Sequence, residues 1–511
     1  MTDLESRTDR PHSGHQRIDT QAAPPDTGAM LDVRPVGYVI GLLLVALGAS
    51  MGVPMAVDLL DQNGHWSAFF EAGMLTMLSG LCLALACANA VRTRLSLQQT
   101  FLLTTGVWLA MPIFAALPFV FGATGSSYTD AFFEAMSGLT TTGSTVLSGL
   151  DDLPRGLLLW RGLLQWFGGI GVIVVAMVFL PELRVGGMQI FRSEGFDTMG
   201  KVLPRAAQIS SQISTIYIGI TIACALAYNA AGMGAFDAVV HAMTTVSTGG
   251  FANYDASFGA FQGPHEYIAT VFMLGAALPF VLYVQLLNGA GQPLVRDSQV
   301  RAFLAVAAVL VGVTAGTLVV FGGMPVERAF REGLFNIASI LTGTGYASVD
   351  YMQWGAFIIT LFFFCGLIGG CAGSTSCSVK IFRYQILFAA MKAQIRRIHS
   401  PNGIFQARYD GRKVAEDVLS SVMAFFVLFV VTLGVFAVLL AMTGLDFLTA
   451  VSGAATAVAN IGPGLGPIIG PAGNFAPLND PAKWLLAAAM LIGRLELVVV
   501  YVLFTARFWR V

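Results

Sequence analysis

Charged residues are scarce in this sequence. Asp, Glu, Lys and Arg make up 11% of the 511 residues, whereas an ordinary soluble domain contains roughly 25%. Hydrophobic residues make up 56% and the mean hydropathy is +0.73, so the chain lacks the polar side chains that would cover a globule in water. The net charge of −1 provides no basic field for nucleic acid. This composition excludes a soluble enzyme, a disordered regulator and a secreted disulfide scaffold, and it predicts an integral membrane protein.

Cysteine is scarce as well, and no two cysteines form a C-x-x-C pair. Thiols in apolar surroundings are typical of small buried hydrophobic side chains, which disfavours both a metal site and disulfides. The six cysteines, all within or beside apolar runs, are Cys82, Cys87, Cys224, Cys365, Cys371 and Cys377.

Two sequence signals are missing. Residues 1–34 contain scattered charge but no apolar run, so they predict a disordered cytoplasmic tail rather than a signal peptide. The phosphate-binding pattern G-x-x-x-x-G-K-[ST] does not occur in the chain. Any control by a nucleotide would therefore come from a separate protein.

Long apolar runs recur along the chain, and about 20 such residues are enough to cross a bilayer as a helix. Most of the 28 lysines and arginines lie in the tail and in the loops on its side of the predicted spans, above all in 379–415. This asymmetry predicts that both termini are cytoplasmic. The ten predicted spans are 36–57, 67–91, 97–121, 157–181, 209–232, 267–288, 301–322, 354–379, 416–443 and 484–506.

Four shorter apolar segments lie between these spans. Each begins with an acidic residue, continues as an Ala-rich helical pattern and ends in a run of Thr, Ser and Gly. An acidic side chain suits the N-cap and the positive end of a short helix, so each segment predicts a re-entrant half-helix followed by an extended strand. The segments are 128–147, 235–251, 331–347 and 445–466, and their acidic residues are Asp130, Asp237, Glu332 and Asp446.

One glycine of each segment marks a repeat, because Gly143, Gly249, Gly345 and Gly462 stand 106, 96 and 117 residues apart. The predicted fold is an all-α polytopic membrane protein of about ten transmembrane helices. Four pseudo-repeats of helix, half-helix, strand and helix surround one pore, and a helical hairpin precedes them. The predicted divisions are the tail (1–34), the hairpin (35–96) and repeats over 97–208, 209–299, 300–415 and 416–511.

Extended backbone at membrane depth is tolerated only where it is buried in protein or lines a cavity. Backbone carbonyls can replace the water of a monovalent cation without adding net charge, and glycine opens backbone angles that aim them inward. Small residues also mediate helix packing, but four matched positions favour an ion filter. Its predicted residues are Thr141, Thr142, Gly143, Ser247, Thr248, Gly249, Gly343, Thr344, Gly345, Asn460, Ile461 and Gly462.

Several motifs, in order along the chain, resemble the membrane pore subunits of the Trk/Ktr potassium uptake systems, and most closely the TrkH branch. The hairpin before the repeats also favours Trk over the shorter Ktr proteins. The resemblance rests on DAFFEAMSGLTTTGSTV, WRGLLQWFGGIGVIV, GGMQIFRSE, FDAVVHAMTTVSTGGF, GGCAGSTSCSVKIFR, NIGPGLGP and GRLELVVV.

The resemblance implies a potassium pore with no covalent cofactor and a gating loop over 369–378, within the eighth predicted span. The small polar residues there independently predict a broken helix. The resemblance also places Arg494 in the pore below the filter, where its charge lowers cation occupancy. The alternatives are that Arg494 forms a local ion pair with Glu496 or that its side chain snorkels to the interface. Arg161 is interpreted as an interfacial anchor. The gate residues are Gly369, Gly370, Cys371, Ala372, Gly373, Ser374, Thr375 and Arg494.

The resemblance further implies a homodimer in the bacterial cytoplasmic (inner) membrane. It implies a cytosolic TrkA-type nucleotide-binding ring as partner, with the basic 379–415 segment as the docking surface. Within transport, the alternatives are a sodium-coupled Ktr-like transporter or a pore subunit driven by a separate ATPase. A membrane enzyme or redox carrier would need a His, Cys or carboxylate constellation, which the spans lack. A non-transport interaction protein would not need four re-entrant strands.

Overall fold

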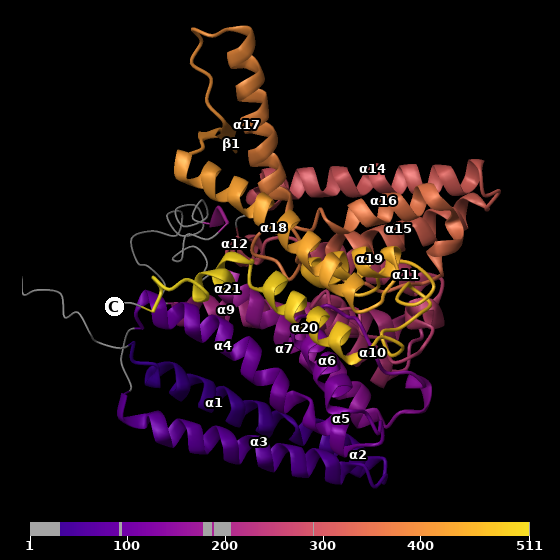
Figure 1. The fold of residues 1–511 in the computed structure, drawn as a ribbon. Helices are drawn as coiled ribbons and strands as arrows, with labels where there is room; N and C mark the ends of the chain where they lie inside the picture. The colour runs from indigo at the N-terminus through magenta and orange to yellow at the C-terminus, as the bar shows by residue number, and fades with distance from the viewer. Residues whose placement is uncertain (1–30, 91–94, 177–185, 189–205, 290, 510–511) are drawn as a thin grey trace, which may run out of the picture.

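The computed structural model describes residues 31–90, 95–176, 186–188, 206–289 and 291–509. The regular secondary structure of these residues is helical apart from one short hairpin, β1 (Arg408–Tyr409) with β2 (Arg412–Lys413), and loops and extended segments connect the helices (Figure 1). Residues 1–30 of the predicted tail lie outside the described part, as do most of the basic 182–208 loop and most of the GGMQIFRSE motif.

The first half of the chain contains α1 (Arg34–Ser50), α2 (Gly52–Leu60), α3 (Trp66–Cys87), α4 (Leu97–Ala115), α5 (Leu117–Phe121), α6 (Tyr128–Leu139), α7 (Arg155–Val174), α9 (Ala206–Ala230) and α10 (Ala235–Val246). The second half contains α11 (Pro264–Ala276), α12 (Phe280–Leu287), α13 (Gln292–Arg296), α14 (Ser298–Val320), α15 (Val326–Thr342), α16 (Ala356–Gly366), α17 (Ile381–His399), α18 (Glu416–Met442), α19 (Phe447–Ala459), α20 (Asp480–Arg494) and α21 (Val498–Leu503).

Seven helical segments among the described residues are long and apolar enough to cross a membrane, and α11 with α12 makes an eighth that bends by 91°. The other two predicted spans are broken. After 11 residues of α16 the chain enters a loop, as the small residues of 369–378 predicted, and α20 stops at Arg494 before α21 begins. The all-helical polytopic fold is confirmed, whereas continuous helices over 267–288 and 484–506 are not.

The four half-helices are α6, α10, α15 and α19, and each is followed by extended backbone. Only Asp446 is an N-cap residue, accepting from the Thr449 backbone N–H at 3.2 Å. Asp130 and Asp237 lie in the first turn instead. The prediction for Glu332 was wrong, because α15 begins six residues earlier and Glu332 pairs with Arg328 at 2.6 Å.

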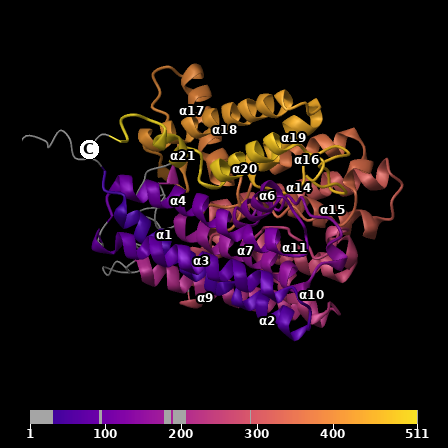
Figure 2. The ribbon, with the colours of Figure 1, turned by 60° about the horizontal axis from the view of Figure 1, so that its bottom comes forward.

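The N-terminal hairpin, α1 to α3, packs along one side of the bundle, with α1 against α4 and α2 against α7 (Figures 1 and 2). Its helices approach closely: a Cβ atom on Gly41 would lie 2.6 Å from the Ala84 backbone nitrogen. The two ends of the described chain meet at the start of α4. Gln99 donates to the Asp32 carbonyl and Gln98 to the Phe508 carbonyl, both at 2.8 Å. Both ends therefore lie on one side of the bundle.

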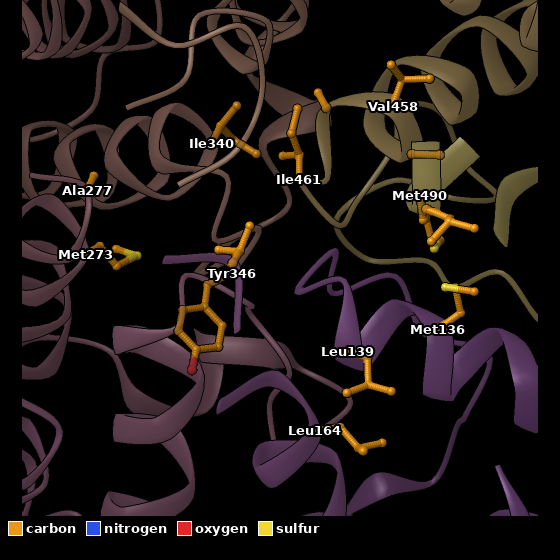
Figure 3. Packing of buried hydrophobic residues seen from close by; sticks show 14 of the residues in the cluster. Met136, Leu139, Leu164, Met273, Ala277, Ile340, Tyr346, Val458, Ile461 and Met490 are labelled. Atoms are coloured by element: carbon orange, nitrogen blue, oxygen red, sulfur yellow. The ribbon is translucent and has the colours of Figure 1, made fainter. Parts of the chain in front are cut away.

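The core surrounds the ends of the four half-helices. Buried hydrophobic side chains from every repeat meet there (Figure 3), among them Leu139, Met273, Ile340 and Met490. By contrast, α17 stands away from the bundle in Figure 1. Close packing at the centre fixes how the four extended strands approach one another.

Candidate functional site

The four half-helices end in the same backbone motif. Each closes with a residue of positive φ, and the next residue donates its N–H to the carbonyl five positions earlier, at 2.8–3.1 Å. These two features define a Schellman motif, which satisfies the last carbonyls of a helix. The positive-φ residues are Thr141 (51°), Thr248 (50°), Gly343 (77°) and Asn460 (53°).

This motif fixes the register between the strands and corrects one prediction. The equivalent of Gly143 in the second strand is Gly250, because both stand two residues beyond the positive-φ residue and have φ of 84° and 79°. Gly249 was predicted in that role, and its φ is not positive. The equivalent triplet in the second strand is therefore Thr248, Gly249 and Gly250, and Ser247 ends the helix. We call Gly143, Gly250, Gly345 and Gly462 the ring glycines.

The ring glycines bring the four strands into a closed circle. A Cβ atom on Gly143 would lie 2.2 Å from the Gly249 carbonyl oxygen, and one on Gly250 would lie 1.9 Å from the Thr344 oxygen. A Cβ atom on Gly345 would lie 1.9 Å from the Ile461 oxygen, and one on Gly462 would lie 2.9 Å from the Thr142 oxygen. Each glycine thus touches the next strand, and the fourth strand touches the first. We call the carbonyls of Thr142, Gly249, Thr344 and Ile461 the ring carbonyls.

A second set of hydrogen bonds holds each strand three residues beyond its ring glycine. The backbone N–H there donates to a buried side chain of the preceding half-helix, although the four side chains differ in type. The pairs are Val146 with Glu134 (3.0 Å), Asn253 with His241 (3.4 Å), Ser348 with Asn336 (3.3 Å) and Leu465 with Ser452 (2.9 Å). Sequence reasoning missed these residues, although three of them stand nine positions before the ring glycine.

The hydroxyls of Thr142 and Thr344, whose carbonyls belong to the ring, bind other protein groups. The Thr142 hydroxyl lies 2.7 Å from that of Thr140 and accepts from the Asn460 amide at 2.9 Å. The Thr344 hydroxyl pairs in the same way with Thr342, at 2.7 Å. In the described structure these two hydroxyls are therefore engaged within the protein, whereas the carbonyls of the same two residues accept no hydrogen bond.

The ring opens at one end into a cavity of about 510 Å³. All four ring glycines line it, whereas Gly249 does not, which agrees with the corrected register. Beyond the ring, the lining residues come from all four strands, and they include Ser144, Phe251, Ala347 and Pro463.

The predicted gate segment 369–378 forms a buried loop against the bend between α11 and α12. The Cys371 N–H donates to the Ala277 carbonyl at 3.0 Å, and the Phe280 N–H donates to the Gly373 carbonyl at 2.9 Å. Ser376 donates to the carbonyl of Thr342, the last residue of α15, at 2.6 Å. The loop is thus attached to the base of the third strand.

Arg494 lies beside this loop and is 3% exposed. Its guanidinium donates to the carbonyls of Thr375 (3.4 Å) and Gly168 (3.2 Å) and contacts the Cys377 sulfur. Both structural alternatives for Arg494 are wrong, because it is too buried to snorkel and Glu496 pairs with Lys380 and Arg383 instead. Arg494 connects the loop to α7.

The interpretation of Arg161 as an interfacial anchor was wrong. Arg161 is 1% exposed and pairs with Glu134 at 2.8 Å. It also donates to the Ala252 carbonyl at 2.7 Å, and its guanidinium lies 4.2 Å from the centre of the Phe251 ring. It therefore links the first strand to the second.

A model of the TrkH family, described as cation transport protein, matches residues 65–511. The chain belongs to the TrkH family. It is a multi-pass membrane transporter, not an enzyme, and the Trk resemblance noted in its motifs is confirmed.

Relatives and a solved structure agree with this assignment. The Trk system potassium uptake protein TrkI of Halomonas elongata is 44% identical over 479 residues, which are 93% of this chain and 97% of that protein. TrkH of Escherichia coli is 36% identical over 485 residues, 93% of this chain and 99% of its own length. The crystal structure of the potassium transporter TrkH from Vibrio parahaemolyticus matches with a TM-score of 0.86 and 33% identity, covering 94% of this chain and all of that one.

The corrected register leads to a prediction for two adjacent glycines. Gly250→Ala should lower thermal stability far more than Gly249→Ala. At Gly250 the methyl group meets the Thr344 backbone carbonyl at positive φ, whereas at Gly249 the three nearest atoms all belong to the side chain of Gln165, so that substitution displaces a side chain and not a strand. The melting temperatures of the purified variants measure the difference. An equal or larger effect of Gly249→Ala would contradict the register.

Proposed function

We propose that the chain carries potassium across the cytoplasmic membrane through the ring carbonyls. The observation that carries this proposal is the closed circle of four strands, in which each ring glycine lies against a carbonyl of the next strand. Neutral carbonyl oxygens suit a dehydrated monovalent cation. The names of the relatives, which are potassium uptake proteins, point to the same ion.

The proposed organisation follows the sequence prediction. Residues 97–208, 209–299, 300–415 and 416–511 each supply one strand to the filter, and 35–96 forms a supporting hairpin. The common side of the two described chain ends and the basic 379–415 segment are assigned to the cytoplasm. The 510 Å³ cavity then faces outward.

The loop 369–378 is the proposed gate. It contacts the base of the third strand through Ser376 and the bent α11–α12 pair through Cys371 and Gly373. Its far end continues through Lys380 and Arg383 into α17, so a pull on α17 reaches the loop. The proposed source of that pull is a cytosolic TrkA-type nucleotide-binding ring, acting on a homodimer of this chain.

The filter is tested in cells that lack their own potassium uptake. The wild-type chain, with its partner, should restore growth on limiting potassium, and Gly345→Ser should lower potassium affinity or admit sodium. A side chain at Gly345 meets the Ile461 carbonyl, because a Cβ there would lie 1.9 Å from its oxygen. Uptake kinetics for both ions measure the change. Gly219→Ser is the control, because no atom lies within 4 Å of a Cβ at that position.

Failure of the expressed wild type to restore growth would count against potassium transport. Unchanged kinetics and ion preference in Gly345→Ser would count against the filter alone.

Neutralising Arg494 should raise potassium flux. A positive charge in a passage of low dielectric repels entering cations, and the same guanidinium binds the Thr375 carbonyl of the loop. Arg494→Ala and Arg494→Gln should therefore conduct more than wild type, with Arg494→Lys intermediate or close to wild type. Flux into liposomes is measured with protein shown to be folded and dimeric. Wild-type flux in folded Arg494→Ala would make the charge structural.

Removing residues 371–375 from the loop should give a large potassium flux that no longer needs the partner. The deletion removes the bonds to Ala277 and Phe280 and shortens the segment that contacts Thr342. A deletion of equal length in the exposed 400–404 turn, which lies within the proposed docking segment 379–415, should give no such flux without the partner. If the loop deletion inserts and folds but conducts no more than wild type without the partner, the loop is not the gate.

A further inference from the structure

One of the four ring carbonyls has a different environment from the other three. The Gly249 carbonyl accepts a hydrogen bond of 2.6 Å from the side-chain amide of Gln165. In the part of the chain that the structure describes, the carbonyls of Thr142, Thr344 and Ile461 accept none. The backbone of the ring therefore has approximate fourfold symmetry, but the hydrogen bonding of its carbonyls does not.

Gln165 is fully buried, and two partners on one strand fix its orientation. Its amide nitrogen donates to Gly249, and its amide oxygen accepts from the Phe251 N–H at 3.0 Å. A carbonyl can only accept and a backbone N–H can only donate, so the amide fits only this way round. One helical turn earlier in α7, Arg161 holds the same strand through Ala252. One face of α7 thus positions the second strand at two levels.

The fourth repeat shows which side chain can occupy the position equivalent to Gln165. A Cβ on Gly168 of α7 would lie 1.9 Å from the Leu139 carbonyl, and one on Gly493 of α20 would lie 2.1 Å from the Val458 carbonyl. Both carbonyls stand four residues before a ring glycine, so the two helix glycines correspond. Three residues before them stand Gln165 in the first repeat and Met490 in the fourth. A buried methionine thus fits the equivalent position.

We propose that Gln165 is a specificity-determining residue of the filter; this rests on the proposed potassium function. The amide N–H draws on the lone pairs of the Gly249 carbonyl and so weakens the field that this oxygen applies to a bound ion. A stronger field favours the smaller Na⁺, because charge–dipole attraction rises as the ion approaches more closely. The same bond restrains the carbonyl from closing around Na⁺. Gln165 therefore favours K⁺ on both grounds.

The test is Gln165→Met, which copies the fourth repeat, with Gln98→Met as the matched control. Gln98 also donates to a backbone carbonyl, that of Phe508, but far from the ring. Uptake by liposomes gives the apparent affinities for K⁺ and Na⁺. The ratio of K⁺ to Na⁺ affinity should fall about two- to tenfold in Gln165→Met, the range that loss of one hydrogen bond represents. Gln98→Met should keep the wild-type ratio.

A second measurement covers a variant that transports poorly. The melting temperature of detergent-purified protein rises with an ion that binds the folded state, so titrations with K⁺ and with Na⁺ report binding without flux. In Gln165→Met, K⁺ should no longer raise the melting temperature at lower concentrations than Na⁺ does. If wild type and Gly345→Ser behave as expected but Gln165→Met keeps the wild-type ratio in both measurements, the assignment of Gln165 is wrong and the filter stands. If wild type shows no potassium response, the proposed function fails as well.

Discussion

Backbone that leaves a helix inside an apolar bundle must still find partners for its polar groups, because no bulk water is present to supply them. The four extended strands of this chain meet that demand in one repeated way. Each helix end is closed by a Schellman motif, and a buried side chain of the half-helix accepts the N–H three residues beyond the ring glycine. These backbone donors are thereby bound within the protein, while three ring carbonyls accept no bond in the described structure. The strands are left with acceptors to offer a cation.

Close approach of the strands requires glycine at one position in each. At the ring glycines a side chain would collide with the carbonyl of the neighbouring strand, and φ is positive at all four. The residues that end the half-helices are less uniform. Thr141, Thr248 and Asn460 also adopt positive φ, which costs L-residues roughly 1–2 kcal/mol each. Packing around the half-helix ends must outweigh this cost, and the buried side chains of Figure 3 supply that packing.

Buried charges occupy distinct places in this arrangement. The Glu134–Arg161 pair joins the first two strands, and Glu496 pairs with Lys380 and Arg383 at the end of the loop segment. Arg494 differs from these, since its described partners are backbone carbonyls and a sulfur rather than a carboxylate. Among the described residues no carboxylate forms a salt bridge with it, and it stands beside the loop 369–378, the proposed gate.

The sequence by itself determined the membrane class, the helical fold, the four half-helices and the break within 354–379, because hydropathy and glycine runs report directly on local structure. It misplaced one ring glycine, since Gly249 and Gly250 are adjacent and only the hydrogen bonds of the helix end select between them. It also could not foresee that Arg161 meets Glu134, or that Gln165 meets Gly249, 27 and 84 residues away. Such contacts depend on how separate helices pack. Tertiary structure alone decided them, because a pattern read along one chain carries no information about which distant backbone group a buried side chain will face.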